Sequence, residues 1–236
     1  MHTHLPSFFV VIPARDEAAT VGDMVRQIRS LHPCRVIVVD DASTDGTPEV
    51  AALAGAEVLR LPRRMGAWCA VRAGFEIVLR EGGDLAVSFD ADGQHLPSTI
   101  GPLVACLGQR RLDVAVGSCP SRAGLWKRFA WMVLRTLSGC PIRDITSGLR
   151  AYNARAMRVL LEPDAADLEY QDVGVLIKLL NRGMRTGEEP SSMAIRLHGR
   201  SRTFPNLASI AAHFVKSCLH CLARRRRPHG ADRGGC

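Results

Sequence analysis

The chain has 236 residues, 47% of them hydrophobic, which is enough to bury the core of one large domain. Its first residues lack the basic start and cleavage site of a secretory signal, and no apolar run reaches the roughly 18 residues that span a bilayer. We therefore expect a cytoplasmic protein. Eight scattered cysteines, with a single CxxC at residues 218–221, fit reduced thiols better than a disulfide framework or a zinc site.

The net charge is +8, because 31 lysines and arginines outnumber 23 aspartates and glutamates. A basic balance suits anionic partners such as nucleotides or lipid surfaces. The densest basic run, ARRRR, lies close to the end of the chain. Because no basic stripe interleaved with aromatic residues occurs before it, nucleic acid is not expected as a partner.

In the first half of the chain, short apolar runs alternate with segments of helical spacing. Strands are predicted at residues 8–12, 35–41, 57–61, 84–92 and 113–118. Helices are predicted at residues 21–31, 47–53, 69–80 and 99–107. This alternation predicts an α/β fold with a mostly parallel sheet that helices cover on both faces. Ligands of such sheets bind beyond the carboxyl ends of the strands.

After residue 124 the pattern becomes mainly helical. Helices are predicted at residues 125–137, 155–161 and 171–180, with a short strand at 193–197. No linker rich in proline, glycine or serine divides the chain, so residues 1–205 are expected to form one domain. Residues 206–236 combine apolar residues at helical spacing with four arginines, which is typical of an amphipathic helix and basic tail on anionic lipid. A core-packed last helix with a solvated tail is the alternative.

The stretch VSFDADGQHLP places two aspartates at the end of a predicted strand. Residues two apart on an extended segment point to the same side, so Asp90 and Asp92 can direct both carboxylates at one point. Two close carboxylates favour a cation between them, and oxygen ligands, with Gln94 as a third, suit Mg²⁺ or Mn²⁺. A strand cap that starts a turn is the alternative.

A second acidic pair, in VIVVDDASTDGT, ends another predicted strand and therefore falls at the same edge of the sheet. Asp41 can accept from the N–H edge of a nucleobase, while Asp40 or the nearby hydroxyls can reach a ribose. Glu17, after the first strand, is either a ligand or a charge in the first turn of the following helix. The two acidic pairs together favour a nucleotide and metal site.

Six blocks occur in order along the chain: VVIPARDE, VIVVDDASTDGT, DADGQHLP, DITSGLRAY, GEEPSSM and HGRSR. In this order they resemble the family 2 glycosyltransferases of the GT-A fold, and specifically their dolichol-phosphate mannosyltransferase-like branch. The resemblance covers residues 8–205. It implies an inverting transfer of a sugar from a nucleotide-diphosphate sugar, GDP-mannose or a UDP-sugar, to a polyprenyl phosphate at the cytoplasmic face of the membrane. A separate membrane-spanning partner subunit is compatible with it.

The resemblance also implies roles for individual residues, block by block. The nucleotide would contact Pro13, Ala14, Glu17, Asp41 and Asp90. The metal, Mg²⁺ or Mn²⁺, and the diphosphate would be held by Asp90, Asp92 and Gln94. The acceptor phosphate or the donor diphosphate would contact Arg128, Ser147, Arg150 and Arg202. A phosphate monoester is largely ionised at pH 7 and needs no base, so the expected catalytic groups are the metal ligands Asp90 and Asp92 and the cation Arg128.

Three positions depart from the family pattern. Ala67 and the bulky Trp68 stand where a small or basic residue and a glycine are usual. Cys119 replaces an arginine, which removes one expected phosphate contact, and Gly174 replaces an acidic residue. These departures leave open a non-catalytic module that binds a nucleotide sugar.

A second alternative concerns the acceptor. The segment EYQDVGVLIKLLNRG resembles the acidic pair that family 2 enzymes use when a sugar hydroxyl attacks, as in polysaccharide or glycolipid synthesis. A hydroxyl has a high pKa and needs a general base, and Asp172 would serve as this catalytic base.

Overall fold

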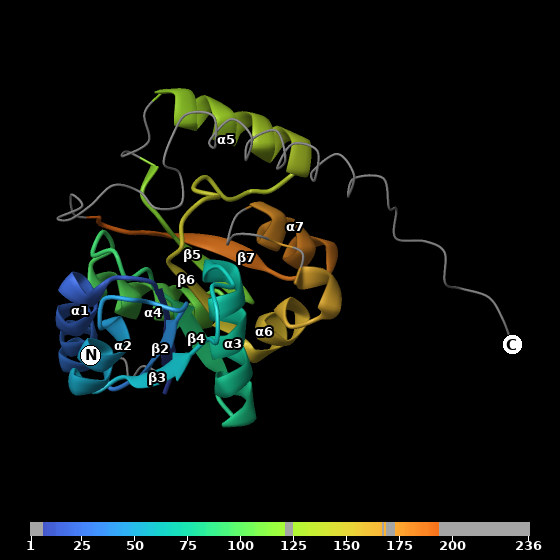
Figure 1. Ribbon diagram of the computed structural model, residues 1–236. Coiled ribbons are helices and arrows are strands. Elements are labelled where there is room, and N and C mark those ends of the chain that lie inside the picture. The colour runs from blue at the N-terminus through green and yellow to red at the C-terminus, as the bar shows by residue number, and fades with distance from the viewer. Residues whose placement is uncertain (1–6, 121–124, 167, 169–172, 194–236) are drawn as a thin grey trace, which may run out of the picture.

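The computed structural model describes residues 7–120, 125–166, 168 and 173–193 (Figure 1). For residues 125–127 it describes the backbone alone. One seven-stranded sheet has the order β3-β2-β1-β4-β6-β5-β7. Its strands are β1 (Phe9–Ala14), β2 (Arg35–Asp40), β3 (Glu57–Arg60), β4 (Leu85–Ser88), β5 (Val114–Ser118), β6 (Arg150–Asn153) and β7 (Thr186–Pro190). Strand β6 is antiparallel to β4 and β5, and the other neighbours are parallel.

Helices cover both faces of the sheet. They are α1 (Ala18–Leu31), α2 (Thr47–Leu53), α3 (Ala67–Arg80), α4 (Ile100–Gln109), α5 (Leu125–Ser138), α6 (Ala154–Leu160) and α7 (Val173–Asn181). In Figure 1, α1, α2 and α4 lie on one side of the sheet, whereas α3, α6 and α7 lie on the other. Two separate hydrophobic clusters fill these sides, because successive strand residues such as Val10 and Val11 point to opposite faces. The predicted α/β fold with a mostly parallel sheet is confirmed.

The prediction of a strand through Asp92 is wrong. Strand β4 ends at Ser88, where its register with both neighbours also ends, opposite Val11 of β1 and Arg150 of β6. Beyond that point the pairing with β1 does not continue after the hydrogen bond of 3.0 Å from the Phe89 N–H to the Val11 carbonyl, and the chain turns through Gly93, which has a φ of 72°. The two aspartates therefore lie in a loop at the edge of the sheet.

Two strands were not predicted from the sequence. Strand β6 lies between β4 and β5 and brings the loop that precedes it to the same edge as their carboxyl ends, because it runs in the opposite direction. Strand β7 has the sequence TGEEP, which lacks the apolar alternation of a half-buried strand, and in the described part of the sheet it is the end strand, paired with β5. Of the strand predicted at 193–197, Met193 forms an isolated bridge with His95, and the other residues lie outside the described ranges.

Residues 206–236, which were predicted to form an amphipathic helix and basic tail, also lie outside the described ranges. Within those ranges, no helix is both long enough and apolar enough to cross a bilayer.

Candidate active site

The Asp90–Asp92 segment keeps an alternating pattern of burial although the strand has ended. Phe89 and Ala91 are buried, whereas Asp90 and Asp92 are half-buried. The two carboxylates are thus directed away from the core. Asp92 also accepts a hydrogen bond of 3.0 Å from the backbone N–H of Gln94. The segment is therefore a turn whose carboxylates remain partly accessible.

A cavity of about 220 Å³ lies beside this turn. It is lined by Asp90, Gln94, His95, Cys119, Trp131, Asp144, Thr146, Ser147, Gly148 and Met193. These residues come from the turn after β4, the end of β5, helix α5, the loop before β6 and the end of β7. Since β6 is antiparallel, its preceding loop meets the carboxyl ends of β4 and β5, and three predicted site residues, Asp90, Gln94 and Ser147, line one cavity.

Gly148 approaches the Asp90 carboxylate more closely than any other residue type would allow. A Cβ atom at position 148 would lie 2.2 Å from Oδ2 of Asp90. Its backbone carbonyl accepts a hydrogen bond of 2.7 Å from Ser88 at the end of β4. The glycine therefore lets the loop before β6 dock directly against the predicted metal ligand.

Arg150 stabilises the loop before β6 through hydrogen bonds to its backbone. Its side chain is fully buried, and the guanidinium donates to the carbonyls of Ser147 and Ile145 at 2.9 Å each. From the other side, the carboxylate of Glu188 on β7 accepts from the backbone N–H of Asp144 at 3.0 Å. The role of Arg150 toward the acceptor phosphate or the donor diphosphate stays a prediction, whereas its contacts with the loop are direct.

Asp144, the first residue of the block DITSGLRAY, lines the cavity although no role was predicted for it. It is only 5% exposed and accepts hydrogen bonds of 3.3 Å from the backbone N–H of Cys119 and the hydroxyl of Thr146. The Ser147 hydroxyl is buried and has no hydrogen-bond partner in the described structure. The position of Asp144 between two other lining segments became visible only in three dimensions.

The predicted nucleotide residues gather at the carboxyl ends of β1 and β2. Pro13 and Ala14 end β1, and Asp41 follows β2. The buried Asp41 carboxylate accepts from the backbone N–H groups of Met65 and Gly66, so it shapes the loop that leads into α3. Asp41 thus supports one wall of the predicted nucleotide site.

Glu17 is connected to the acidic turn through one hydroxyl. Thr20 donates to the Glu17 carboxylate at 3.3 Å and to the carbonyl of Ala91 at 2.8 Å. Ala91 stands between the two predicted metal ligands. The nucleotide side and the acidic turn are therefore neighbours at one edge of the sheet.

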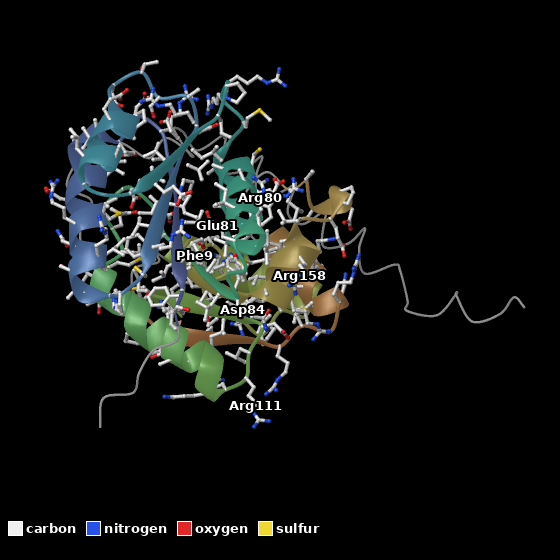
Figure 2. The ribbon with its side chains drawn as sticks, turned by 90° about the horizontal axis from the view of Figure 1, so that it is seen from below. Phe9, Arg80, Glu81, Asp84, Arg111 and Arg158 are labelled. Carbon is white, nitrogen blue, oxygen red and sulfur yellow. The ribbon has the colours of Figure 1, made fainter. Side chains whose placement is uncertain are left out.

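A larger cavity, of about 780 Å³, lies at the opposite edge, near the amino ends of β1, β2 and β4. Figure 2 shows this end from below, with Phe9, Glu81 and Asp84 close to the middle of the view. In this larger cavity, Arg35 forms ion pairs with Glu81 and Glu57, and its guanidinium carbon lies 5.0 Å from the ring centroid of Phe9. Because ligands of such sheets bind at the carboxyl ends, we place the site in the smaller cavity.

The comparisons with known proteins agree with this geometry. The model of the family described as glycosyl transferase family 2 matches residues 9–159. The chain belongs to glycosyltransferase family 2. It is 31% identical to an undecaprenyl-phosphate mannosyltransferase of Micrococcus luteus over 81% of this chain and 85% of that one. It is 30% identical to a polyprenol monophosphomannose synthase of Mycolicibacterium smegmatis over 82% and 79% of the two chains.

Among solved structures, the glycosyltransferase resembles a glucosyl-3-phosphoglycerate synthase of Mycobacterium tuberculosis bound to phosphoglyceric acid, with a TM-score of 0.70 and 22% identity. The match covers 94% of this chain and 81% of that chain. Another structure of that enzyme, with Mn²⁺, UDP and glucosyl-3-phosphoglycerate, gives a TM-score of 0.68. This likeness confirms the predicted GT-A fold.

The residues at the acidic turn of this glycosyltransferase have the chemistry of a substrate-completed metal site. In the ranges described here, no group of three or more His, Cys, Asp or Glu side chains is placed to hold a metal by itself. The side chains of Asp90, Asp92 and Gln94, the predicted ligands, carry the oxygen atoms that such an ion would need, and Gly148 leaves room for the Asp90 carboxylate. Mg²⁺ and similar ions are often held by one or two carboxylates plus substrate phosphates, so the residues fit such an ion.

The remaining predicted site residues are dispersed. Arg128 is exposed on α5, three residues before Trp131, which lines the cavity. Asp172 and Arg202 lie outside the described ranges. Arg143 is exposed next to Asp144, and its backbone N–H donates to Glu188. The resemblance gave no role to that position.

The departures from the family pattern lie in different environments. Trp68 is buried and donates its indole N–H to the carbonyl of Ala165 at 2.9 Å, so it belongs to the core. Gly174 is buried in the first turn of α7. Cys119 lines the candidate site, where its side chain replaces the arginine that is usual.

Proposed function

We propose that this family 2 glycosyltransferase is an inverting enzyme that transfers a sugar from a nucleotide-diphosphate sugar to a polyprenyl phosphate. The observation that carries the proposal is one cavity lined by Asp90 and Gln94 of the acidic turn and by Ser147 of the loop before β6. The predicted donor and acceptor residues thus meet at one point. The names of both relatives, which specify undecaprenyl phosphate and polyprenol as the lipid, support the same acceptor class.

In this reaction an oxygen of the lipid phosphate attacks the anomeric carbon from the side opposite the diphosphate. The bond between that carbon and the diphosphate oxygen breaks, and its electron pair leaves with the nucleoside diphosphate. No base is required, because the second pKa of a phosphate monoester is about 6. Asp90, Asp92 and Gln94 would hold Mg²⁺ or Mn²⁺, which supplies positive charge to the leaving diphosphate.

The chain must also hold the acceptor phosphate close to another anion. Guanidinium groups are suited to this, because they bind phosphate through paired hydrogen bonds. Of the described arginines near the cavity, Arg143 and Arg128 are exposed, whereas Arg150 is buried under the loop. We assign the phosphate to the two exposed arginines, together with Arg202, and the support of the loop to Arg150.

A lipid acceptor requires contact with a membrane, and we place this contact at the cytoplasmic face. Phe129 and Met132 on α5 are 56% and 55% exposed, and residues three apart lie on the same side of a helix. Trp131, on the same helix, is buried and lines the cavity. In Figure 1, α5 lies at the top of the view, beyond the end of the sheet, and it also contacts α7. Residues 206–236 and a membrane-spanning partner subunit belong to the proposal as further contacts.

The deciding experiment offers the purified chain GDP-mannose and UDP-sugars with Mn²⁺, and either undecaprenyl phosphate, dolichyl phosphate or a sugar acceptor. We expect a glycosylated lipid phosphate from one donor. Transfer only to the sugar acceptor, slowed by Asp172→Asn, would instead support a hydroxyl acceptor with Asp172 as base. Donor binding without transfer to any acceptor would support a non-catalytic module.

A further inference from the structure

Trp68 stands in the first turn of α3, directly after the loop of residues 61–66 that joins β3 to this helix. Met65 and Gly66, the last residues of this loop, donate their backbone N–H groups to the Asp41 carboxylate. Asp41 is buried and follows β2, so it fixes the loop from the side of the sheet. Because Asp41 is also a predicted nucleotide contact, the position of the loop bears on the nucleotide site.

Trp68 fixes the same loop from the other side. Its side chain is only 2% exposed, and its indole N–H donates a hydrogen bond of 2.9 Å to the carbonyl of Ala165. These two residues lie 97 positions apart in the chain. The start of α3 is therefore attached to a distant segment, which restricts the loop that leads into the helix.

The segment after α6, which accepts this bond, is itself held by two helices. Arg72 on α3 donates to the carbonyls of Leu160 and Leu161 at 3.0 and 3.2 Å. Lys178 on α7 is buried and forms an ion pair of 2.9 Å with Glu162. Figure 1 shows α6 beside α3, and α6 contacts both α3 and α7. The carbonyl that Trp68 binds thus belongs to a segment with a well-defined position.

We propose that Trp68 is a positioning residue for the donor nucleotide. Its bond to Ala165 keeps the loop before α3 in the conformation in which this loop and Asp41 form one wall of the nucleotide site. This inference rests on the proposed function, because it presupposes a nucleotide donor. A loop that is already ordered loses less conformational entropy when a ligand binds, so the affinity for the ligand is higher. A residue that only filled the core would change stability and leave the loop and the nucleotide unaffected.

The first measurement is amide hydrogen exchange at Met65 and Gly66 in the full chain without ligand, followed by NMR. Trp68→Phe removes the indole N–H and keeps an aromatic side chain. We expect this variant to exchange the two amides about tenfold faster, which corresponds to the loss of about one hydrogen bond. Phe75→Leu is the matched control, because Phe75 is a fully buried aromatic residue of the same helix that packs against Tyr152. The control should lower stability without changing the exchange of the two amides.

The second measurement is the affinity for UDP and for GDP with Mn²⁺ present, by isothermal titration calorimetry at a temperature at which every variant is folded. For whichever nucleotide binds, we expect Trp68→Phe to weaken binding at least about threefold, because the loop must be ordered on binding. Phe75→Leu should bind this nucleotide as tightly as the wild type does.

A second variant separates the hydrogen bond from the packing, and it applies even if Trp68→Phe fails to fold. 3-Benzothienylalanine incorporated at position 68 has nearly the shape of tryptophan but lacks the N–H donor. It should reproduce both the faster exchange and the weaker binding while the core stays filled. Wild-type exchange and affinity in this variant would overturn the inference.

Two further outcomes separate the inference from the proposed function. If UDP or GDP binds and Trp68→Phe matches the control in exchange or in affinity, Trp68 only fills the core, and the proposed function stands. If neither UDP nor GDP binds to the correctly folded wild-type chain, the proposed function fails and the inference fails with it.

Discussion

At the scale of single residues, the contact between Gly148 and Asp90 sets the geometry of the acidic turn. Any Cβ at position 148 would collide with the carboxylate oxygens. The φ of Gly148 is not positive, so a side chain at this position is excluded by lack of space and not by the backbone conformation. The glycine of the block DITSGLRAY thus has a physical reason that lies in another segment of the chain.

We expect Gly148→Ala to displace the Asp90 carboxylate and to weaken Mn²⁺-dependent donor binding at least about tenfold, or about 1.4 kcal/mol. The measurement is titration with the nucleotide sugar at fixed Mn²⁺. Gly108→Ala is the control, because position 108 in α4 has no atom within 4 Å of an added Cβ. Equal affinities in the two variants would contradict the role of this contact.

Arg150 and Arg143 differ in burial although both flank the same loop. Removing the buried guanidinium leaves the carbonyls of Ser147 and Ile145 without donors. We therefore expect Arg150→Met to lower the free energy of unfolding by roughly 2–4 kcal/mol, measured by urea denaturation.

Arg143→Ala should instead change stability by less than about 0.5 kcal/mol, since the side chain is exposed. If it holds the acceptor phosphate, KM for the polyprenyl phosphate should rise about tenfold while donor affinity stays the same. A wild-type KM would remove Arg143 from the acceptor site.

At the scale of elements, α5 joins the candidate site to the exterior. Trp131 faces the cavity, whereas Phe129 and Met132 expose apolar side chains. Large apolar side chains exposed on the same side of a helix are suited to the interface of a bilayer. An amphipathic pattern predicts a helix whether its apolar residues pack on the core or contact lipid. The sequence alone therefore does not show that α5 buries Trp131 at the cavity and also exposes Phe129 and Met132.

We expect the double substitution Phe129→Ser and Met132→Ser to lower binding to vesicles that contain anionic lipid at least about tenfold, because burying each side chain contributes about 1.5–3 kcal/mol. Co-sedimentation measures this. Leu53→Ser is the control, since Leu53 on α2 is 88% exposed and thus more exposed than either residue of α5. A similar loss in the control would show that general hydrophobicity, and not α5, governs binding.

At the scale of the whole molecule, one edge of the sheet collects segments that are far apart in the chain. The predicted nucleotide residues lie at the carboxyl ends of β1 and β2, the acidic turn follows β4, and the loop before β6 reaches the same edge. Thr20 connects the first two groups through Glu17 and Ala91. The donor and metal are therefore expected to stabilise the entire domain rather than one loop.

At 100 times its dissociation constant, a nucleotide sugar with Mn²⁺ should raise the free energy of unfolding by about 2.7 kcal/mol. Thermal denaturation of the chain with and without both ligands measures the shift. Asp92→Asn should abolish the part that requires Mn²⁺ and leave the melting temperature of the free chain nearly unchanged, because Asp92 is half-buried in a turn. A metal-dependent shift that survives in this variant would exclude Asp92 as a ligand.

The sequence by itself determined the parallel strands, the helices between them and the two acidic pairs. Apolar runs and helical spacing are local patterns, and in a parallel sheet they also specify which strand ends share an edge. Its ordered blocks likewise predicted the family. The roles of individual site residues stay predictions, and Asp172 and Arg202 lie outside the described ranges.

Only the tertiary structure decided how the second half completes the site. Strand β6 is antiparallel and β7 is a polar edge strand. The residues of a short strand do not determine its direction or its place at the edge of a sheet. The same folding buried Arg150, brought Asp144 beside Cys119 and set Gly148 against Asp90. These relations depend on contacts between residues distant in sequence, because packing, and not local propensity, fixes where a loop and its charges lie.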